Sequence, residues 1–183
     1  SHELKTPLTA ITLRESKPPI WRRIQVKSNT TLAKLHDIFQ IVMGWTDSHL
    51  HQFIIHGAEY GVPHPDYDMD MEDEKHFKLG KLIFAEKERF IYQYDFGDSW
   101  EHEIIVEKIL PIEKDLHYPI CLKGNRACPP EDCGGIWGYP DFLEAIENVN
   151  HPEHNDMLEW IGGKFDPEEF DIESANKKLK RIK

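Results

Sequence analysis

The chain has 183 residues, of which 39% are hydrophobic and 30% are charged, and its formal net charge is -11. This composition is typical of a globular protein and excludes a disordered chain. A strongly negative field repels phosphate backbones, so a nucleic-acid partner is not expected. No apolar run approaches the roughly 20 residues that a bilayer-spanning helix needs, and no signal peptide is recognisable. We therefore expect a cytoplasmic protein with no membrane partner and a single domain over residues 1–183.

Two alternating segments near the start predict a β-hairpin. Residues 8–14 and 20–27 alternate apolar and polar side chains, and two consecutive prolines keep their connection out of a helix.

An amphipathic helix is predicted next. Thr30 and Thr31 are suited to its N-cap, apolar residues recur at three- and four-residue spacing, and Gly44 is suited to its end.

The remaining elements predict an α+β fold. Further strands are predicted at residues 49–56, 89–95 and 100–109. Residues 57–78 are acidic, lack periodicity and are expected to be irregular. An α+β core over residues 8–110 would then be followed by a Cys/Pro/Gly-rich loop segment at 111–139 and by C-terminal helices at 140–183. We expect a β-grasp-like mixed sheet of about five strands with one packed helix and a C-terminal helical region.

The run YDFGDSWEHEI covers the end of one of these strands, the connection, and the start of the next strand. Its Asp-Phe-Gly is also the magnesium-binding tripeptide of protein kinases, but the Gly-rich loop, strand lysine and His-Arg-Asp loop that accompany it in kinases are absent. Gly97 and Asp98 instead predict a two-residue turn, because glycine tolerates positive φ and aspartate caps turns. That register would place Asp95 opposite Trp100.

Polar residues of this hairpin and of the preceding strand form the candidate functional surface. His49 and His51 are two residues apart on one predicted strand, so their imidazoles would point to the same face. The surface comprises His49, His51, Asp95, Asp98, Trp100 and His102. A metal site at His49, His51 and Asp98 would suit zinc or manganese, and its bound water would make the protein a hydrolase. A histidine beside apolar strand residues is also compatible with a plain core position.

The cysteine segment offers a second metal hypothesis. His117, Cys121, Cys128 and Cys133 supply the ligand types of a Cys₃His zinc site. Only the spacing between the last two cysteines approaches that of a structural zinc pair, so a rigid loop with buried thiols is the alternative. A disulfide framework is not expected from three cysteines in a chain without a secretory signal.

Five ordered blocks resemble one known family. They read KPPIWRRIQV, LHDIFQIVMGWTDSHLHQF, YDFGDSWEHEI, CPPEDCGGIWGY and HPEHNDMLEWIGGKFDPEEFD. Together they resemble the plasmid pRiA4b open-reading-frame-three-like family over nearly the whole chain. The resemblance implies an uncharacterised protein often encoded beside mobile elements. Some members carry a transposon-resolvase label, but this acidic chain lacks the arginine-supported serine and the helix-turn-helix that a serine resolvase needs.

These observations lead to two functional hypotheses. The first is a cytoplasmic binding or interaction domain whose partner is a protein or a small molecule. The alternative is a metal-dependent hydrolase that uses the His/Asp cluster. The sequence leaves open which of the two applies, and with it whether the protein is an enzyme.

Overall fold

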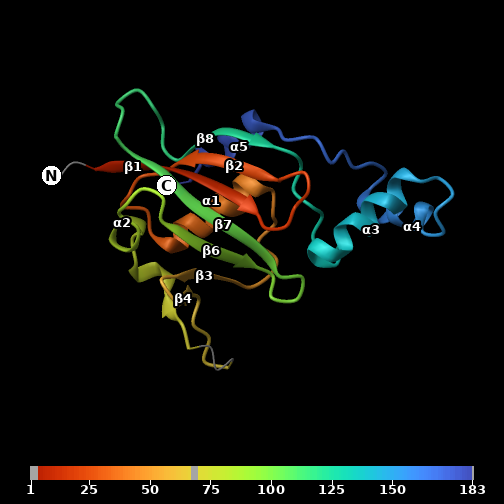
Figure 1. Cartoon of the computed structure of the whole chain (residues 1–183), viewed down its shortest axis with the longest axis horizontal. Coiled ribbons are helices and arrows are strands. Elements are labelled where there is room, and N and C mark those ends of the chain that lie inside the picture. The colour runs from red at the N-terminus through yellow and green to blue at the C-terminus, as the bar shows by residue number, and fades with distance from the viewer. Residues whose placement is uncertain (1–3, 67–69, 183) are drawn as a thin grey trace.

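One large sheet dominates the fold (Figure 1). The computed structural model describes residues 4–66 and 70–182. Across these residues the strands form an eight-stranded sheet in the order β5-β4-β3-β6-β7-β1-β2-β8. Its pairings are antiparallel except that of β4 with β5, which is parallel. The strands are β1 (Lys5–Leu13), β2 (Trp21–Gln25), β3 (His51–Ile55), β4 (Ala58–Gly61), β5 (Glu72–Asp73), β6 (Arg89–Tyr94), β7 (Trp100–Pro111) and β8 (Ile120–Asn125).

The predicted α+β class is confirmed, but the predicted sheet of about five strands is wrong. All five predicted strands are present, as β1, β2, β3, β6 and β7. The three additional strands lie toward the sheet edges, where strands are short or alternate poorly. β4 and β5 lie in the acidic segment 57–78, of which residues 67–69 are outside the described part, and β8 lies in the predicted loop segment 111–139. The β-grasp comparison is not confirmed.

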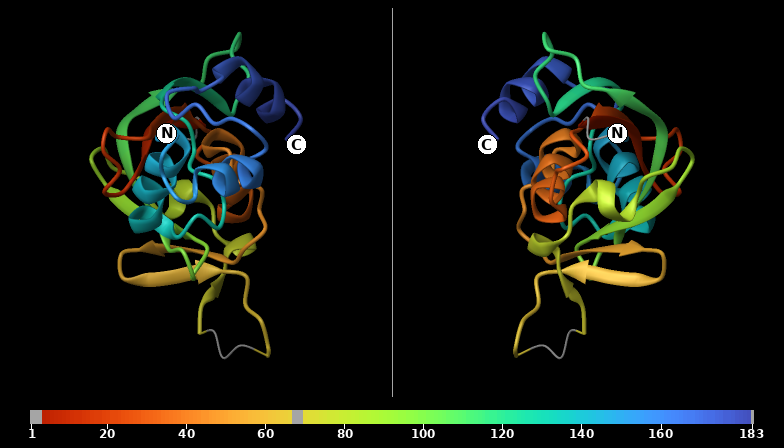
Figure 2. Two further views of the ribbon diagram at one scale, coloured as in Figure 1. Left: turned by 90° about the vertical axis from the view of Figure 1, so that its right-hand side faces the viewer. Right: turned by 90° about the vertical axis from the view of Figure 1, so that its left-hand side faces the viewer.

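Helix α1 (Leu32–Met43) covers one face of the sheet, which curves around it (Figure 2). The Thr31 side chain accepts a hydrogen bond from the Lys34 amide at 3.2 Å and so caps the helix start. Gly44 ends it in the left-handed conformation, with φ of 113°. Strand β7 alternates buried and half-buried residues, as expected of a sheet that is covered on one face only.

The other helices lie at the margins of the sheet. They are η1 (Glu74–His76), α2 (Leu79–Leu82), α3 (Gly135–Glu147), α4 (His154–Ile161) and α5 (Ile172–Leu179). Helices α3 and α4 extend beyond one end of the sheet (Figure 1), whereas α5 packs against β8 and α1. Helix α3 begins at Gly135, five residues before position 140, where the C-terminal helices were predicted to start. Among the described residues, no helix is long and apolar enough to cross a membrane.

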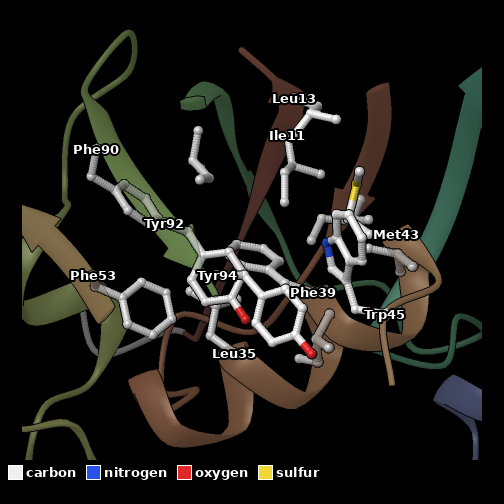
Figure 3. Close-up of a cluster of buried hydrophobic side chains, with 14 of the residues drawn as sticks. Ile11, Leu13, Leu35, Phe39, Met43, Trp45, Phe53, Phe90, Tyr92 and Tyr94 are labelled. Carbon is white, nitrogen blue, oxygen red and sulfur yellow. The ribbon is translucent and has the colours of Figure 1, made fainter. Parts of the chain in front are cut away.

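Aromatic side chains fill the space between α1 and the sheet. Figure 3 shows Phe39 of α1 facing Phe53 and Tyr92 of the sheet, and the ring centroids of Phe39 and Tyr92 are 5.1 Å apart. The Tyr92 hydroxyl is fully buried but accepts a hydrogen bond from the Gln40 amide at 2.8 Å. This helix therefore contributes both apolar contacts and the polar partners that buried hydroxyls require.

Arg22 is a fully buried cation at the junction of several elements. Its guanidinium donates to four carbonyl groups, those of Val42 at 2.7 Å, Trp21 at 2.8 Å, Asn125 at 3.0 Å and Met43 at 3.4 Å. The Phe170 ring lies 3.7 Å from its central carbon. Burial lowers the pKa of Arg22 to about 10, so the side chain stays charged near neutral pH. Arg22 therefore joins β2 to β8, to the end of α1 and to the segment before α5.

We predict that Arg22→Met lowers the free energy of unfolding by about 2–4 kcal/mol, because buried carbonyls lose their donors. Chemical denaturation followed by far-UV circular dichroism measures the change. Arg23→Met is the matched control: Arg23 is half-exposed and pairs with Glu107 on the open face of the sheet, so a loss of at most about 1 kcal/mol is expected. Equal stability of Arg22→Met and the wild type would show that the hydrogen bonds from Arg22 to these carbonyl groups make no net contribution to the free energy of unfolding.

His102 is fully buried on β7 and has both ring nitrogens occupied. Its Nδ1 lies 2.9 Å from the Tyr92 carbonyl oxygen, and its Nε2 lies 3.1 Å from the indole nitrogen of Trp45. A carbonyl only accepts and an indole N–H only donates, so the ring is the neutral tautomer with its proton on Nδ1. Burial lowers the pKa of His102 to about 4. The unfolded chain therefore binds a proton at higher pH than the folded chain does.

We predict that His102 makes stability fall as the pH is lowered from 6.5 to 4. Its folded pKa of about 4 lies below the unfolded value of about 6.5. This difference in pKa corresponds to about 3 kcal/mol of folding stability, which is present above pH 6.5 and is lost as the pH falls to 4. Urea unfolding at a series of pH values measures the slope. His102→Gln should make the slope shallower, although buried His36, whose pKa is also lowered, will keep part of it. The exposed His117→Ala should leave the slope unchanged, and an unchanged slope in His102→Gln would contradict the assignment.

Candidate metal centre

Three connections from distant parts of the chain meet beyond the ends of β3 and β6. They are the α1–β3 loop (residues 44–50), the hairpin turn (residues 95–99) between β6 and β7, and the proline loop (residues 126–134) between β8 and α3. Each of them contributes polar side chains to one cluster. The site is therefore formed by tertiary contacts and not by one local motif.

The hairpin turn is longer than predicted. Tyr94 pairs with Trp100, so five residues form the turn, and the predicted register with Asp95 opposite Trp100 is wrong. Asp95 leaves the strand because its backbone is left-handed, with φ of 63°. Its Oδ1 accepts hydrogen bonds from the amides of Gly97 at 3.0 Å and Asp98 at 3.3 Å. This local bonding organises the turn and leaves Oδ2 to face the α1–β3 loop.

The Nε2 atom of His49 lies close to three carboxylates. This nitrogen lies 2.9 Å from Oδ1 of Asp132, 3.6 Å from Oδ2 of Asp95 and 3.8 Å from Oε1 of Glu131. It is buried, yet it makes no hydrogen bond to a described residue. The distance to Asp132 is short enough for a hydrogen bond. The bond is therefore missing because the Asp132 oxygen does not lie along the axis of the N–H bond.

A shared metal ion would produce this arrangement. An ion about 2.1 Å from nitrogen and oxygen separates the two by about 3.0 Å at a right angle and by about 3.4 Å at a tetrahedral angle. The ion occupies the nitrogen axis, so the oxygens lie to its side. The ligand atoms of His49, Asp95 and Asp132 all lie within 4.8 Å of one another. An imidazolium hydrogen-bonded to Asp132 would instead align its N–H with the oxygen.

Glu131 fixes the proline loop to the rest of the site. Its Oε1 accepts a hydrogen bond from the Tyr94 hydroxyl at 2.8 Å, and its Oε2 accepts one from the Thr46 amide at 2.6 Å and another from the Thr46 hydroxyl. Burial and the bond to Glu131 raise the pKa of Tyr94, which therefore remains a protonated donor. Glu131 is thus suited to hold Asp132 in place.

His51 lies apart from this cluster. Strand β3 begins at His51, so His49 precedes the strand and does not share its face. The His51 ring stacks on that of His36, with centroids 3.4 Å apart and planes 8° apart, and its Nε2 lies 2.6 Å from Glu74. His36, Asp47 and His51 could by distance hold an ion. A metal binds in the plane of an imidazole, however, and two parallel planes share no point, so stacked rings cannot bind one ion together.

The other predicted residues of the functional surface are also separated from His49. Asp98 accepts a hydrogen bond from the Gly134 amide at 3.2 Å and helps to begin α3. Trp100 and His102 are core residues, although the Trp100 indole N–H has no described partner. Of the six predicted residues, only His49 and Asp95 supply ligand atoms to this cluster. The set His49, His51 and Asp98 does not form one cluster.

The four residues of the zinc hypothesis do not meet either. Among the residues described, the clusters with metal-binding spacing contain neither His117 nor any cysteine. Burial raises the pKa of all three thiols, Cys121 to about 11 and Cys133 to about 12, with Cys128 well above its ordinary value. Thiolates are therefore disfavoured at these positions, of which Cys121 is buried and Cys128 and Cys133 are partly buried.

Asp132 and Glu131 were missed by the sequence analysis. They follow two prolines and precede two glycines in a segment that was interpreted by its cysteines. Two adjacent carboxylates in such a rigid loop were the feature of the sequence that could have indicated a site. Their pairing with His49 involves residues more than 80 positions away, which residue spacing cannot reveal.

Comparisons with known proteins agree with the resemblance seen in the sequence. The profile of the plasmid pRiA4b ORF-3-like protein family matches residues 8–174. The uncharacterized protein y4hQ of Sinorhizobium fredii is 35% identical over 167 residues, which cover 91% of this chain and 84% of y4hQ. The crystal structure of MM3350, a protein of unknown function from Methanosarcina mazei Go1, has a TM-score of 0.85 at 39% identity and covers 93% of this chain and 97% of its own. The chain therefore belongs to the plasmid pRiA4b ORF-3-like protein family.

Proposed function

We propose that this protein is a divalent-cation-binding domain, with His49, Asp95 and Asp132 as ligands and Glu131 as the residue that orients the proline loop. The observation that carries the proposal is the buried Nε2 of His49, which is 2.9 Å from a carboxylate oxygen without forming a hydrogen bond to it. Buried polar atoms are normally satisfied, so an unaligned nitrogen surrounded by carboxylates requires an explanation. A bound cation supplies one.

The donor set selects the class of cation. One imidazole nitrogen with carboxylate oxygens suits Zn²⁺ and Mn²⁺, whereas Mg²⁺ and Ca²⁺ prefer oxygen alone. The three carboxylates near the His49 imidazole carry three negative charges, which a divalent ion reduces to one. Because the whole chain has a formal charge of -11, neutralising a local acidic cluster also lowers its repulsion.

The cation would connect the three converging loops. Each ligand comes from a different one: His49 from the α1–β3 loop, Asp95 from the hairpin turn and Asp132 from the proline loop. Asp95 and Asp132 both have left-handed backbones with φ of 63°, a conformation in which aspartate is enriched at modest cost. Metal binding should therefore stabilise the folded state and order this end of the sheet.

Metal-dependent hydrolysis is a second candidate, and one observation favours it. The Asp132 side chain is 65% exposed, so an ion at this position would be open to water and substrate. A hollow of about 360 Å³ borders His49, with Leu50 and Val62 on its wall. Asp37, Asp47 and Glu74 also line it, so an anionic substrate would be repelled.

We predict that the purified protein, freed of metal by a chelator, binds one equivalent of Zn²⁺ or Mn²⁺ in isothermal titration calorimetry. At a concentration of about 100 times Kd the ion should stabilise the fold by about 2.7 kcal/mol, measured as a rise in Tm. His49→Ala, Asp95→Asn and Asp132→Asn should each raise Kd by at least about tenfold. Asp141→Asn, which removes an exposed carboxylate on α3, is the control and should bind as the wild type does.

Two results would overturn the proposal. One is no binding of either ion to the wild type. The other is a Kd in all three ligand variants that equals the Kd of the wild type. Hydrolysis is tested separately with p-nitrophenyl acetate, a neutral ester, and bis-p-nitrophenyl phosphate, an anion. Metal-dependent turnover of the neutral ester that is lost in His49→Ala would make the protein a hydrolase. Stoichiometric binding without turnover of either ester would leave cation binding as the function.

A further inference from the structure

A second cavity lies between the turn that joins β1 to β2 and the first half of α3. It has a volume of about 590 Å³. Its apolar walls include Ile20, Ile136 and Leu143, and none of the proposed metal ligands lines it. The volume is in the range of small-molecule sites, which combine apolar walls with a few polar groups.

Arg126 provides a largely buried positive charge in the wall of this cavity. Its side chain is only 10% exposed, and one guanidinium nitrogen contacts Glu168, which is itself largely exposed. A guanidinium has five N–H donors arranged as a planar fork. Contact with one carboxylate at one nitrogen therefore leaves donors that a second carboxylate can use.

Tyr139 adds a hydroxyl without a partner. The residue is 6% exposed and lines the cavity, and its hydroxyl has no hydrogen-bond partner among the described residues. Its ring packs against Phe142 and Phe165, which fixes the orientation of the side chain. Burial raises the pKa of Tyr139 and the charge of Arg126 acts in the opposite direction, so the guanidinium field reaches the phenol. Tyr139 is thus a protonated donor close to a cation.

Trp137 presents a large aromatic surface at the edge of the same cavity. Its side chain is 80% exposed, which is unusual for tryptophan. The residue lies in the first turn of α3, a position that the helix backbone fixes. An exposed indole beside a partly apolar cavity can stack on a planar ring.

We propose that this cavity binds a small aromatic carboxylate. The carboxylate would accept hydrogen bonds from Arg126 and from the Tyr139 hydroxyl, and the ring would lie against Trp137 and the apolar wall. Two charges at the rim bear on the choice of ligand: Lys17 attracts an anion and Glu15 repels it. Both are exposed, and neither makes an ion pair with a residue that the structure describes. Removing one charge should therefore strengthen the binding of an anion, and removing the other should weaken it.

The experiment titrates the whole chain with β-naphthoate and with its neutral isostere β-naphthylmethanol at low ionic strength. Calorimetry or ligand-observed NMR gives the two dissociation constants. The naphthoate should bind at least about tenfold more tightly, because only it can make charge-assisted hydrogen bonds. Arg126→Gln should abolish this difference, and Tyr139→Phe should weaken naphthoate binding by about threefold to tenfold.

Surface variants keep the test independent of folding. Glu15→Gln should strengthen naphthoate binding and Lys17→Gln should weaken it, each by about twofold to fivefold. Trp137→Ala removes an exposed ring and should weaken both ligands, whereas Phe84→Ala removes another exposed ring away from the cavity and should change neither.

Three results would overturn the proposal. They are equal binding of the naphthoate and the alcohol, naphthoate affinity that is unaffected by Trp137→Ala and both rim variants, and no binding at about 5 mM ligand. The Zn²⁺ and Mn²⁺ titrations use different residues. Failure of this proposal and failure of the cation proposal are therefore distinguishable.

Discussion

The burial of the Arg22 guanidinium is the constraint on which the candidate site depends. A buried cation needs acceptors for its donors, and Arg22 finds them in the carbonyls of Val42 and Met43 at the end of α1. These carbonyls are among the groups that a helix terminus leaves unpaired. Arg22 therefore binds the helix end to β2, and the left-handed Gly44 then sets the direction of the α1–β3 loop. Trp45 donates to His102 in the core, and Thr46 donates to Glu131 of the proline loop, so His49 follows two residues whose contacts are already fixed.

The same sequence of contacts concentrates negative charge. Glu131 is anchored by Tyr94 and Thr46, which brings Asp132 to His49, and the hairpin turn brings Asp95 to the same nitrogen. The folded chain thus assembles three carboxylates around one imidazole although its net charge is already -11. Like charges at these separations repel, and the fold has no arginine or lysine in the described ion pairs of this cluster. A divalent cation in the cluster would offset that repulsion.

The sequence predicted the fold best where local signals are strong. Alternation identified the five inner strands, and the threonine cap and Gly44 identified α1, because these features depend on neighbouring residues. Strands β4, β5 and β8, toward the two edges of the sheet, depend on partners that sequence spacing does not reveal. The site shows the same division: His49 and Asp95 were predicted, but the strand was extended two residues too far, which placed His49 on the face of His51. Asp132 was missed because only the folded chain brings the proline loop to the hairpin turn. The organisation of the chain as a single domain stays a prediction.

The proline loop connects the two sites that we propose. Arg126 is its first residue, Asp132 lies near its end, and Trp137 follows in the first turn of α3. Glu131 joins this loop to the α1–β3 loop through Thr46, so the loop cannot shift without disturbing the carboxylates around His49. If a cation restricts the motion of the loop, it also restricts the guanidinium and the indole that line the neighbouring cavity. Thermodynamic linkage then requires the effect to be reciprocal: the factor by which the cation changes the affinity for a carboxylate equals the factor by which the carboxylate changes the affinity for the cation.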